Sequence, residues 1–503
     1  MSLLGIDLGT SGIKCVAYNI DGKPLARAYR EHLLYTPELG VVELDPRIVW
    51  YNLKENIKEL NSKEAIIKDP INSLSVSVSA DEALPINKKG EILYNTIMSM
   101  DKRGREENNY INSIIGAEKV FKLTGQPPDS IYALNRLLWF KNYRKDIFKQ
   151  IYKFLCWEEY IFYKLGSETV TDYSIASRTL AFDINSNKWS EEILNSVGIG
   201  MEIFPKVCSS GVAISEISSK LINDLGFKNR VKIITGGFDQ CCAALGAGVT
   251  KKGMTSIGTG TMEVMQVCFD EPIINSKIMN EGYSFIPHVL KDLFICLTLN
   301  FNGGVIFKWY RDNLACDEKI KASELNMGIY DIIMDSANKS NYPVLFLPYF
   351  EGAQTPWKKP EATGSFFGLT LRTKREDIIR GIIEGITFDL RFNLDMMAEQ
   401  GIDIKTIRAT GGGARSETWL HFKADITGRV IQKLDIDEAG CMSAAVLAGY
   451  GSGEFNSIKH VIDSWVKVKK EYHPDLSKKS YYDDRYLKFV DVCKKVIDLK
   501  LNF

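Results

Sequence analysis

The hydrophobic pattern at the start of the chain predicts two strands joined by a tight turn. Residues 3–7 are apolar up to the terminal Asp7, residues 9–12 read Gly-Thr-Ser-Gly, and residues 13–18 form a second run rich in β-forming side chains. Glycine combined with Thr or Ser is typical of a turn between strands. We therefore expect the chain to begin with a meander that starts a sheet.

Further apolar runs predict more helices and strands in the first half. Residues 46–62 carry apolar side chains at helical spacing. Residues 74–79 form a short strand-like run, and polar residues follow it at 79–82, where open α/β sheets bind their ligands. A second apolar strand at 231–234 leads through a glycine pair toward a small-residue helix at 242–248.

The second half repeats features of the first half. A strand, a Gly-Thr turn and another strand recur at 255–267. The segment 231–237 runs from a strand into glycines, and the segment 406–412 does the same. Repeated patterns indicate a repeated architecture. The composition turns polar after residue 248, so two α/β domains of the same architecture are predicted, at residues 1–248 and 249–503.

Composition and charge narrow the classes of function. Apolar residues make up 45% of the 503 residues and charged residues 25%, as in ordinary globular proteins. Lys and Arg together number 63, as do Asp and Glu, so the net charge is zero. Nucleic-acid binders and proteins held on anionic membranes usually carry a basic excess, so we expect neither partner. No run of 18 apolar residues and no signal-peptide pattern occurs, which favours a cytoplasmic protein.

The ten cysteines and five histidines do not indicate a zinc site or a disulfide framework. No Cys-x-x-Cys and no His-Glu-x-x-His pattern occurs. Reduced thiols in a cytoplasmic protein are therefore the simplest interpretation.

The two Gly-Thr turns are candidate phosphate-binding sites. A phosphate needs several backbone N–H groups at close range, and a Cβ would block its approach. The candidates are Thr10, Ser11, Gly258 and Thr259, with Lys14 as a nearby cation. One such turn alone is better explained as an ordinary hairpin turn, but two in matching contexts favour a pair of phosphate sites. Neither a P-loop pattern nor Gly-x-Gly-x-x-Gly occurs, which disfavours P-loop enzymes and dinucleotide-binding dehydrogenases.

Two carboxylates lie next to strand ends. A carboxylate beside a phosphate is repelled unless a metal ion lies between them, so Asp7 is a candidate Mg²⁺ partner through water. Stabilising the turn is the alternative, and for Asp7 taken alone it is the better one. Asp239 could accept a proton from a substrate hydroxyl. Capping the helix that follows is an equally good interpretation of its local sequence.

A third glycine-rich turn occurs at residues 411–414, after the strand that ends at Thr410. A flat ring such as adenine could pack on a glycine surface of this kind, and Ser416 would start the next helix. Tight packing of that helix on the strand is the alternative, and glycine alone does not separate the two interpretations.

In combination, these motifs resemble the FGGY family of carbohydrate kinases over almost the whole chain. The residues that carry the resemblance are 5–11 (the first phosphate motif), 43–50, 237–240 (the catalytic Asp-Gln element), 257–261 (the second phosphate motif), 348–356, 368–384, 411–414 (the adenosine motif) and 438–445. Each motif is weak alone, but eight of them occur in the family's order.

The resemblance implies an α/β fold of two ribonuclease H-like domains, of the actin/Hsp70 ATPase type, with a central cleft. ATP would lie mainly on the C-terminal domain and the sugar mainly on the N-terminal one. Asp239 is implied as the catalytic base and Asp7 as the Mg²⁺-associated acid. Together with the turns above, the expected nucleotide-binding residues are Thr10, Ser11, Lys14, Gly258, Thr259, Gly304, Gly411, Gly412 and Ser416.

The expected sugar site departs from the patterns of the known subfamilies. Residues 79–82 read Ser-Ala-Asp-Glu, unlike the Met-His-Gly of xylulose kinases or the Arg-Glu of glycerol kinases. Two carboxylates there can accept hydrogen bonds from several hydroxyls and would repel an acidic substrate. A solvated loop is the alternative for them. The expected sugar-binding residues are Asp81, Glu82, Asp101, Arg103 and Gln240, the last three through the resemblance.

The sequence therefore predicts an ATP-dependent carbohydrate kinase, similar to xylulose kinases, that phosphorylates a primary hydroxyl of a small ketose or polyol. Asp239 would be the general base, and Mg²⁺–ATP the phosphoryl donor. The alternatives are a non-catalytic sugar or nucleotide sensor on the same fold, and an actin/Hsp70-like ATPase. The presence of both Asp7 and Asp239 argues against a sensor. Members of this family are often dimers or tetramers, so the resemblance suggests a homo-oligomer such as a homodimer, although no interface can be read from the sequence.

Overall fold

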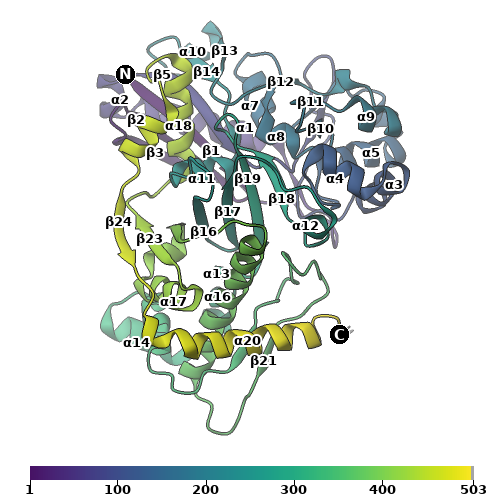
Figure 1. Cartoon of the computed structure of the whole chain (residues 1–503). Coiled ribbons are helices and arrows are strands. Elements are labelled where there is room, and N and C mark those ends of the chain that lie inside the picture. Colours follow the sequence, from purple (N-terminus) through teal and green to yellow (C-terminus); the bar gives the residue numbers. More distant parts are fainter. Residues whose placement is uncertain (500–503) are drawn as a thin grey trace.

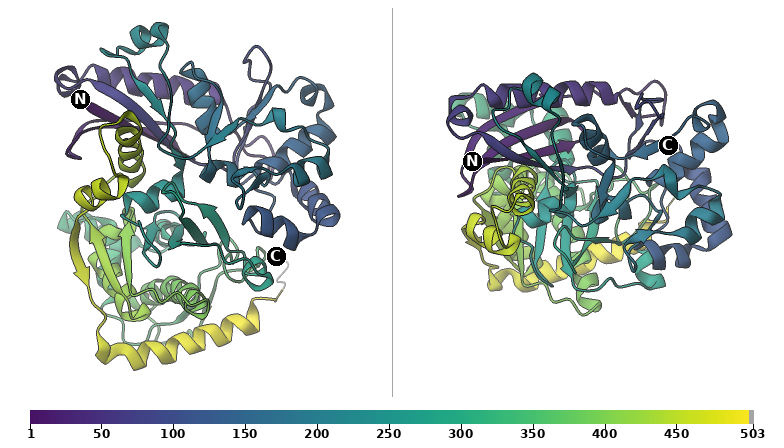
Figure 2. Two further views of the ribbon diagram at one scale, coloured as in Figure 1. Left: turned by 45° about the horizontal axis from the view of Figure 1, so that its top comes forward. Right: turned by 90° about the horizontal axis from the view of Figure 1, so that it is seen from above.

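Two large β-sheets organise the chain. The computed structural model describes residues 1–499, and each of its two main sheets has seven strands. Figure 1 shows the sheets in two lobes, the first containing the purple N-terminal strands and the second the teal to yellow strands. Figure 2 shows the same lobes from two further directions, with helix α20 (Lys479–Val496) running along the outside of the second lobe.

The first sheet is built around β1 (Ser2–Gly9), with the strand order β13-β14-β5-β1-β2-β3 and with β15 paired to β5. β1 is antiparallel to β2 and parallel to β5. The other strands are β2 (Gly12–Asn19), β3 (Pro24–Glu31), β5 (Ile71–Val78), β13 (Ala213–Glu216), β14 (Lys232–Ile234) and β15 (Gly237–Phe238). β1 lies inside the sheet with both faces covered, which explains its nearly continuous apolar run.

The second sheet is built around β16 (Thr255–Thr259), with the strand order β18-β19-β17-β16-β22-β23-β24. β16 is antiparallel to β17 and parallel to β22. The other strands are β17 (Glu263–Phe269), β18 (Ser284–Pro287), β19 (Phe294–Asn300), β22 (Thr406–Thr410), β23 (Val430–Leu434) and β24 (Val468–Tyr472). The predicted repeat of strand, turn and strand is confirmed by the hairpins β1–β2 and β16–β17.

The two sheets share one topology. β5 lies beside β1 as β22 lies beside β16, both parallel to the central strand, and β14 and β23 follow as the next parallel strands. The segment 406–412 therefore corresponds to β5 and the residues that follow it. The predicted match between 406–412 and 231–237 is wrong. A strand that runs into glycines is too short a pattern to identify its place in a sheet.

Helix α11 (Asp239–Gly246) contacts both sheets, and α18 (Ala439–Ser452) packs against it. α18 comes late in the chain but packs on β1 and β5 of the first sheet. Glycines allow this close approach: a Cβ on Gly5 would lie 1.8 Å from the carbonyl oxygen of Cys441, and one on Gly246 would lie 2.3 Å from that of Ala439. Residues from the two halves of the chain therefore lie side by side where α18 packs on α11 and β1.

Helices and short strands from 43 to 225 surround the first sheet, with α1 (Pro46–Asn61) against β2 and β3. The remaining elements of this part are β4 (Glu43–Leu44), α2 (Glu64–Lys68), β6 (Leu84–Ile86), β7 (Thr96–Ile97), α3 (Arg105–Ile115), α4 (Ala117–Thr124), α5 (Ala133–Tyr143), α6 (Lys145–Phe148), β8 (Lys153–Leu155), α7 (Trp157–Lys164), β9 (Val170–Asp172), α8 (Tyr173–Ser177), β10 (Phe182–Asp183), β11 (Lys188–Trp189), α9 (Glu191–Val197), β12 (Lys206–Cys208) and α10 (Ser219–Leu225).

The second sheet is covered by helices of the C-terminal half, among which α16 (Arg375–Glu399) packs on α17 (Glu417–Thr427). The remaining elements here are α12 (Ser276–Asn280), α13 (Gly304–Asn313), α14 (Cys316–Leu325), α15 (Ile329–Ala337), β20 (Leu345–Leu347) and β21 (Ser365–Phe367). Helix α19 (Ile458–Trp465) packs instead on α18.

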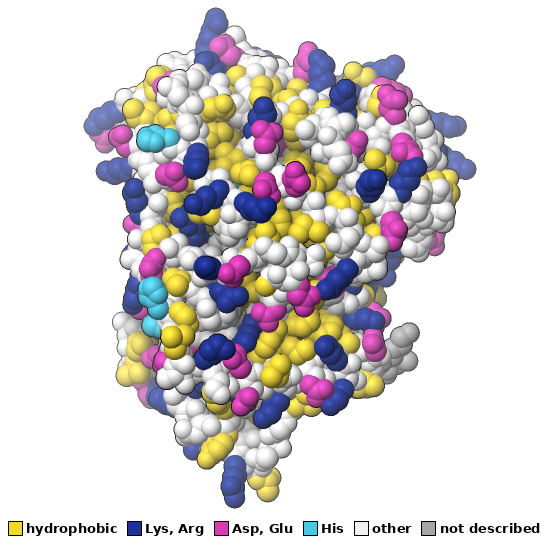
Figure 3. All heavy atoms as spheres, in the orientation of Figure 1, with side chains coloured by type: hydrophobic (Ala, Val, Ile, Leu, Met, Phe, Trp, Pro, Cys, Tyr) yellow, Lys and Arg dark blue, Asp and Glu magenta, His cyan; other side chains and the backbone are white. Residues whose placement is uncertain are grey.

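The surface carries both signs of charge. On the face shown in Figure 3, basic and acidic side chains are interspersed over both lobes, in keeping with the net charge of zero. Among residues 1–499, no helix has the length and hydrophobicity needed to cross a membrane.

Candidate active site

The turn of the first hairpin places Asp7 and Lys14 opposite each other on β1 and β2. Ser77 on β5 donates a hydrogen bond from Oγ to Asp7 Oδ1 at 2.7 Å. Lys14 Nζ donates to Glu438 Oε2 at 2.9 Å, at the residue just before α18. The carboxylate of Asp7 is thus bonded to the neighbouring strand, which does not match the turn-stabilising alternative for this residue.

Burial and neighbouring charges set the ionisation of this pair. Burial raises the pKa of Asp7 above its ordinary value, and the Ser77 hydroxyl and the Lys14 ammonium oppose that rise. Partial burial opposes the charged form of Lys14, but the hydrogen bond to Glu438 and the charge of Asp7 raise the pKa of the amine overall. Lys14 is therefore a cation held beside Asp7.

Asp239 is the first residue of α11. The N-cap of this helix is Phe238, and no side chain forms a cap hydrogen bond, so the capping interpretation of Asp239 is wrong. The helix also begins three residues before the predicted start at 242. The Asp239 carboxylate is bonded by Gln240 Nε2, which donates to Oδ1 at 3.2 Å.

The charges around Asp239 explain its ionisation. Burial raises the pKa of Asp239 well above its ordinary value, and the negative charges of Asp7, Glu82 and Asp81 raise it further. Three other predicted site carboxylates therefore act on the ionisation of Asp239. A carboxyl group with a raised pKa is suited to accept a proton near neutral pH.

A buried polar network fixes the backbone that leads to Asp239. Glu158 Oε1 accepts a hydrogen bond from Gly236 N at 2.7 Å. Ser174 Oγ accepts from Phe238 N at 2.8 Å and donates to Asp172 Oδ1 at 2.9 Å. The sequence interpretation missed these residues, because nothing local to Glu158 or Ser174 indicates a contact with a segment more than 60 positions away.

Asp81 and Glu82 follow β5 and lie in two different environments. Asp81 Oδ1 accepts a hydrogen bond from Arg178 Nε at 2.7 Å, and its side chain is 16% exposed. Glu82 is buried, and its Oε2 has no hydrogen-bond partner among the described residues. Burial and the charge of Asp81 raise the pKa of Glu82. The solvated-loop alternative is therefore wrong for Glu82.

Asp101 and Arg103 form a pair with each other. Asp101 accepts from Val42 N at 2.7 Å and from the backbone and guanidinium of Arg103 at 2.6–2.9 Å. Arg103 also forms an ion pair with Glu43 at 2.9 Å and lies over the ring of Trp139. The acceptor positions of Asp101 are thus occupied within the protein. Gln240 likewise accepts from Gln266 Nε2 at 2.9 Å, which connects it to the second sheet.

Four of the predicted nucleotide-binding residues meet at the turn of the second hairpin. Gly304, the first residue of α13, donates from its backbone N to the Gly260 carbonyl at 2.8 Å. Gly258 pairs with Thr410, and a Cβ on Gly411 would lie 2.7 Å from the carbonyl oxygen of Thr259. Glycine is required at Gly411 for a second reason, its φ of 81°. A Cβ on Gly412 would meet no atom within 4 Å, so the space above this residue is open.

The remaining predicted residues lie at helix and hairpin ends. Ser416 is the N-cap of α17, where its side chain accepts a hydrogen bond from Trp419 N, as the sequence predicted for the start of this helix. Thr10 and Ser11 form the turn between β1 and β2, and His32 Nε2 lies 3.1 Å from the Thr10 carbonyl. A Cβ on Gly9, just before this turn, would also meet no atom within 4 Å.

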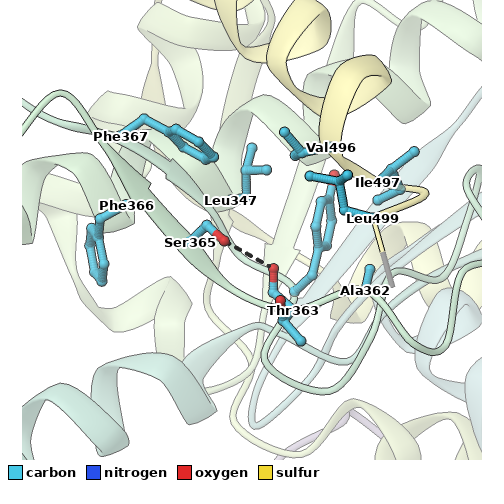
Figure 4. Close-up of a pocket in the computed structure, with 10 residues that line it drawn as sticks. Leu347, Ala362, Thr363, Ser365, Phe366, Phe367, Val496, Ile497 and Leu499 are labelled. Carbon is cyan, nitrogen blue, oxygen red and sulfur yellow. Dashed lines mark hydrogen bonds between the residues drawn. The ribbon is translucent and has the colours of Figure 1, made fainter. Parts of the chain in front are cut away.

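A cavity of about 370 Å³ lies elsewhere, beneath α20. Figure 4 shows its lining, mostly apolar residues of β20, β21 and the end of α20 such as Leu347, Phe367 and Val496. None of the predicted site residues lines it.

Comparison with known proteins identifies the family. The model of the N-terminal domain of the FGGY family of carbohydrate kinases matches residues 2–246, and that of the C-terminal domain matches residues 253–452. The chain belongs to the FGGY family of carbohydrate kinases. It is therefore a phosphotransferase that acts on a sugar hydroxyl, as predicted.

Relatives of this FGGY kinase cover its whole length. The chain is 27% identical over 487 residues to a xylulose kinase of Staphylococcus xylosus, with 96% of this chain and 97% of the relative covered. It is 28% identical over 466 residues to a gluconokinase of Bacillus subtilis (strain 168), with 92% and 90% covered. The crystal structure of a ligand-bound xylulose kinase from Lactobacillus acidophilus superposes with a TM-score of 0.89 at 24% identity, covering 99% of this chain and 98% of that one.

These matches confirm the predicted fold. The FGGY kinase has the two-domain architecture of the actin/Hsp70-like ATPases, with one ribonuclease H-like sheet topology in each half. The relatives act, by their names, on different sugars or sugar acids, so family membership leaves the substrate of this kinase open.

Proposed function

We propose that this kinase transfers the γ-phosphoryl group of ATP to a primary hydroxyl of a small ketose or polyol, with Asp239 as the general base. The observation that carries the proposal is the position of Asp239. It begins α11 without capping it, and the charges of Asp7, Asp81 and Glu82 act on it. A hydroxyl held by Asp81 and Glu82 would lie next to a carboxylate able to take its proton.

Asp239 acts as the hydroxyl oxygen attacks the phosphorus. The O–H bond breaks, its proton passes to the Asp239 carboxylate, and the new O–P bond forms as the bond to the leaving ADP oxygen breaks. The raised pKa of Asp239 makes it a better proton acceptor than an ordinary carboxylate. Lys14, the Thr10–Ser11 turn and the turn at 258–261 would stabilise charge on the transferred group.

The residues near Asp7 fit a magnesium ion that is carried by the nucleotide. Among residues 1–499, no group of three or more His, Cys, Asp or Glu side chains could hold a metal ion. Mg²⁺ commonly binds through one carboxylate, several waters and the substrate phosphates, and Asp7 with Ser77 offers one such carboxylate. When bound there, the ion would neutralise negative charge on the phosphates.

The open space over Gly412 supports a nucleotide at the second hairpin. Gly258, Thr259, Gly304 and Gly411 pack around the same turn, and Gly412 presents bare backbone on its free side. A purine ring could lie against this backbone, since no atom of residues 1–499 outside the immediate neighbours of Gly412 lies within 4 Å of a Cβ built there. The donor would thus reach from the second sheet toward Lys14 on β2 and Asp239 at the start of α11.

The experiment is sugar-dependent ADP release from Mg²⁺–ATP with a panel of ketopentoses, ketohexoses, alditols and aldonates. Wild type and Asp239→Asn are compared, with Asp395→Asn as the matched control, since Asp395 accepts a hydrogen bond from Tyr486 on the far side of the second sheet. We expect one ketose or polyol to stimulate ADP release in wild type and in the control, but not in Asp239→Asn. ADP release that ignores every sugar, or survives intact in Asp239→Asn, contradicts the proposal.

A further inference from the structure

A buried arginine stands behind the carboxylates of the proposed sugar site. Arg178, just after α8, is 3% exposed and forms an ion pair with Asp81, Nε to Oδ1, at 2.7 Å. Its guanidinium lies 5.0 Å from the ring centroid of Tyr132 and 5.4 Å from that of Phe238, the residue before Asp239. Arg178 thus contacts both Asp81 and Phe238, the residue that precedes the proposed base.

Among residues 1–499, the Nη2 group of this guanidinium has no hydrogen-bond partner. Nη1 donates to Gln126 Oε1 at 2.6 Å and approaches Ser284 Oγ at 3.5 Å, and Nε donates to Asp81. The planar guanidinium directs its N–H groups in a fixed fork, and Nη2 points to the same side as Nε. Nη2 is therefore the donor on the Asp81 side of the guanidinium, and the Asp81 side chain is 16% exposed.

The proposed site is otherwise rich in acceptors. Asp81, Glu82 and Asp239 all present carboxyl oxygens, which bind the hydrogens of sugar hydroxyls. A ketone oxygen carries no hydrogen, so it needs a donor and is repelled by carboxylates. The donors of Arg103 are turned toward Asp101, Glu43 and Tyr94. A site that prefers a ketose to an alditol therefore needs a hydrogen-bond donor for the carbonyl oxygen, placed among these acceptors.

We propose that Arg178 determines specificity, by donating from Nη2 to the carbonyl oxygen of an open-chain ketose while Asp81 accepts from a neighbouring hydroxyl. This rests on the proposed function and assigns its substrate class as a neutral ketose. Arg178 and Asp81 act as one charge-neutral donor–acceptor pair. Since Asp81 already neutralises the arginine, the pair offers no net positive charge to hold the carboxylate of an aldonate.

The test pairs each 2-ketopentose and 2-ketohexose with the alditol formed by reducing its carbonyl, and measures kcat/KM for wild type and Arg178→Met. A hydrogen bond to a charged group is worth roughly 10- to 100-fold in binding. We expect Arg178→Met to lower kcat/KM for the ketose relative to that for the alditol by about that factor. An alditol hydroxyl can rotate and donate to the carboxylates, which a carbonyl cannot do.

Arg391→Met is the matched control, because Arg391 also pairs with a carboxylate, Asp483 at 2.6 Å, and lies over the ring of Tyr486. It should leave the ratio of ketose to alditol unchanged. Equal losses for ketose and alditol in Arg178→Met would show a merely structural role and overturn the inference. A wild type that turns over only alditols or aldonates overturns it while leaving the kinase proposal intact, whereas a wild type that turns over nothing overturns both.

A second variant should increase activity on aldonates, a result that misfolding would not produce. Asp81→Asn removes the charge that neutralises Arg178 and leaves the guanidinium as a free cation. We expect kcat/KM for the aldonates to rise at least about tenfold relative to the ketose, because a charge-assisted pair with the substrate carboxylate becomes available. If the ratio of kcat/KM for the aldonate to that for the ketose is unchanged in Asp81→Asn, the pair of Arg178 and Asp81 does not determine specificity.

Discussion

The same position in the two sheets carries opposite chemistry. Counted from the hairpin turn, the third cross-strand pair is Asp7 with Lys14 in the first sheet and Ile257 with Met265 in the second. The strand topology is shared, but two residues separate the first pair of the first hairpin and three separate that of the second, so the comparison is made by cross-strand pair. Charged groups that could act on a transferred phosphoryl group occur only at the first of these two positions.

The segments after the corresponding parallel strands differ in the same way. β5 is followed by Asp81 and Glu82, whereas β22 is followed by residues 411–414, three glycines and an alanine. The first segment offers carboxyl oxygens to hydroxyl groups, and the second offers bare backbone to a flat ring. One duplicated architecture has thus been specialised, on the proposed function, for the sugar and the chemistry in one half and for the nucleotide in the other.

The largest effect should come from Asp239, the proposed base at the start of α11. Asp239→Asn keeps the shape and removes the base, so we expect kcat to fall by roughly 10²- to 10⁴-fold. The dissociation constant for Mg²⁺–ATP should stay within about twofold, as measured by equilibrium titration. A parallel loss of nucleotide binding would mean that Asp239 belongs to the nucleotide site instead.

The cross-strand pair gives the next effect. Lys14→Met makes the first hairpin resemble the second, and removing one preorganised cation should lower kcat roughly 100-fold. Met265→Leu, at the corresponding position, should leave kcat unchanged. Steady-state kinetics at saturating ATP compares the two variants, and a similar loss in both would remove the proposed asymmetry between the sheets.

Two glycines with open space allow a direct comparison of the turns. A Cβ on Gly9 or on Gly412 meets no atom within 4 Å, so neither Gly→Ala change should disturb the fold. Gly412→Ala should raise KM for ATP roughly tenfold with little change in kcat, because the methyl group occupies the proposed ring position. Gly9→Ala should mainly lower kcat. The reverse pattern of kinetic effects would exchange the roles that we assign to the two turns.

The smallest effect concerns stability and pH. The pKa of Asp239 is raised above its ordinary value of 3.8 in the folded state, so the folded chain binds more protons than the unfolded chain between these two pKa values. The contribution of Asp239 to the free energy of unfolding therefore falls as the pH rises from the unfolded-state pKa to the folded-state pKa. Asp239→Asn should raise the Tm by about 1–3 °C above this pH range and not below it, as measured by calorimetry across pH. A Tm difference that is independent of pH would contradict this assignment.

Much of this fold could be predicted from the sequence, since the apolar runs at 3–7, 13–18 and 255–267 are sheet strands as expected. The pairing of 231–237 with 406–412 failed, because order within a sheet depends on contacts far apart in the chain. The start of α11 was misplaced for a local reason. Gly236 and Gly237 predict a turn, but Gly237 pairs with Ser77 in a short strand that ends directly at Asp239.

The candidate site could be predicted less completely. Asp7, Asp81, Glu82 and Asp239 are visible as polar residues at strand ends, and the charges of the first three raise the pKa of Asp239. Arg178 was not predicted, because its meaning depends on a contact with Asp81, 97 residues away. The general-base role, the substrate contacts, the domain boundary, the oligomeric state and the cellular compartment stay predictions.

The central claim is that the first half of the chain binds the sugar and the second half binds the nucleotide. Equilibrium binding of each substrate alone tests this claim most directly. The affinities of Mg²⁺–ATP and of the ketose with the strongest effect on ADP release are measured for wild type, Glu82→Gln and Gly412→Ala. We expect Glu82→Gln to weaken only the ketose and Gly412→Ala only the nucleotide, each by roughly tenfold or more. Loss of both ligands in either variant, or the reversed pattern, would contradict the assignment of sugar to the first half and nucleotide to the second.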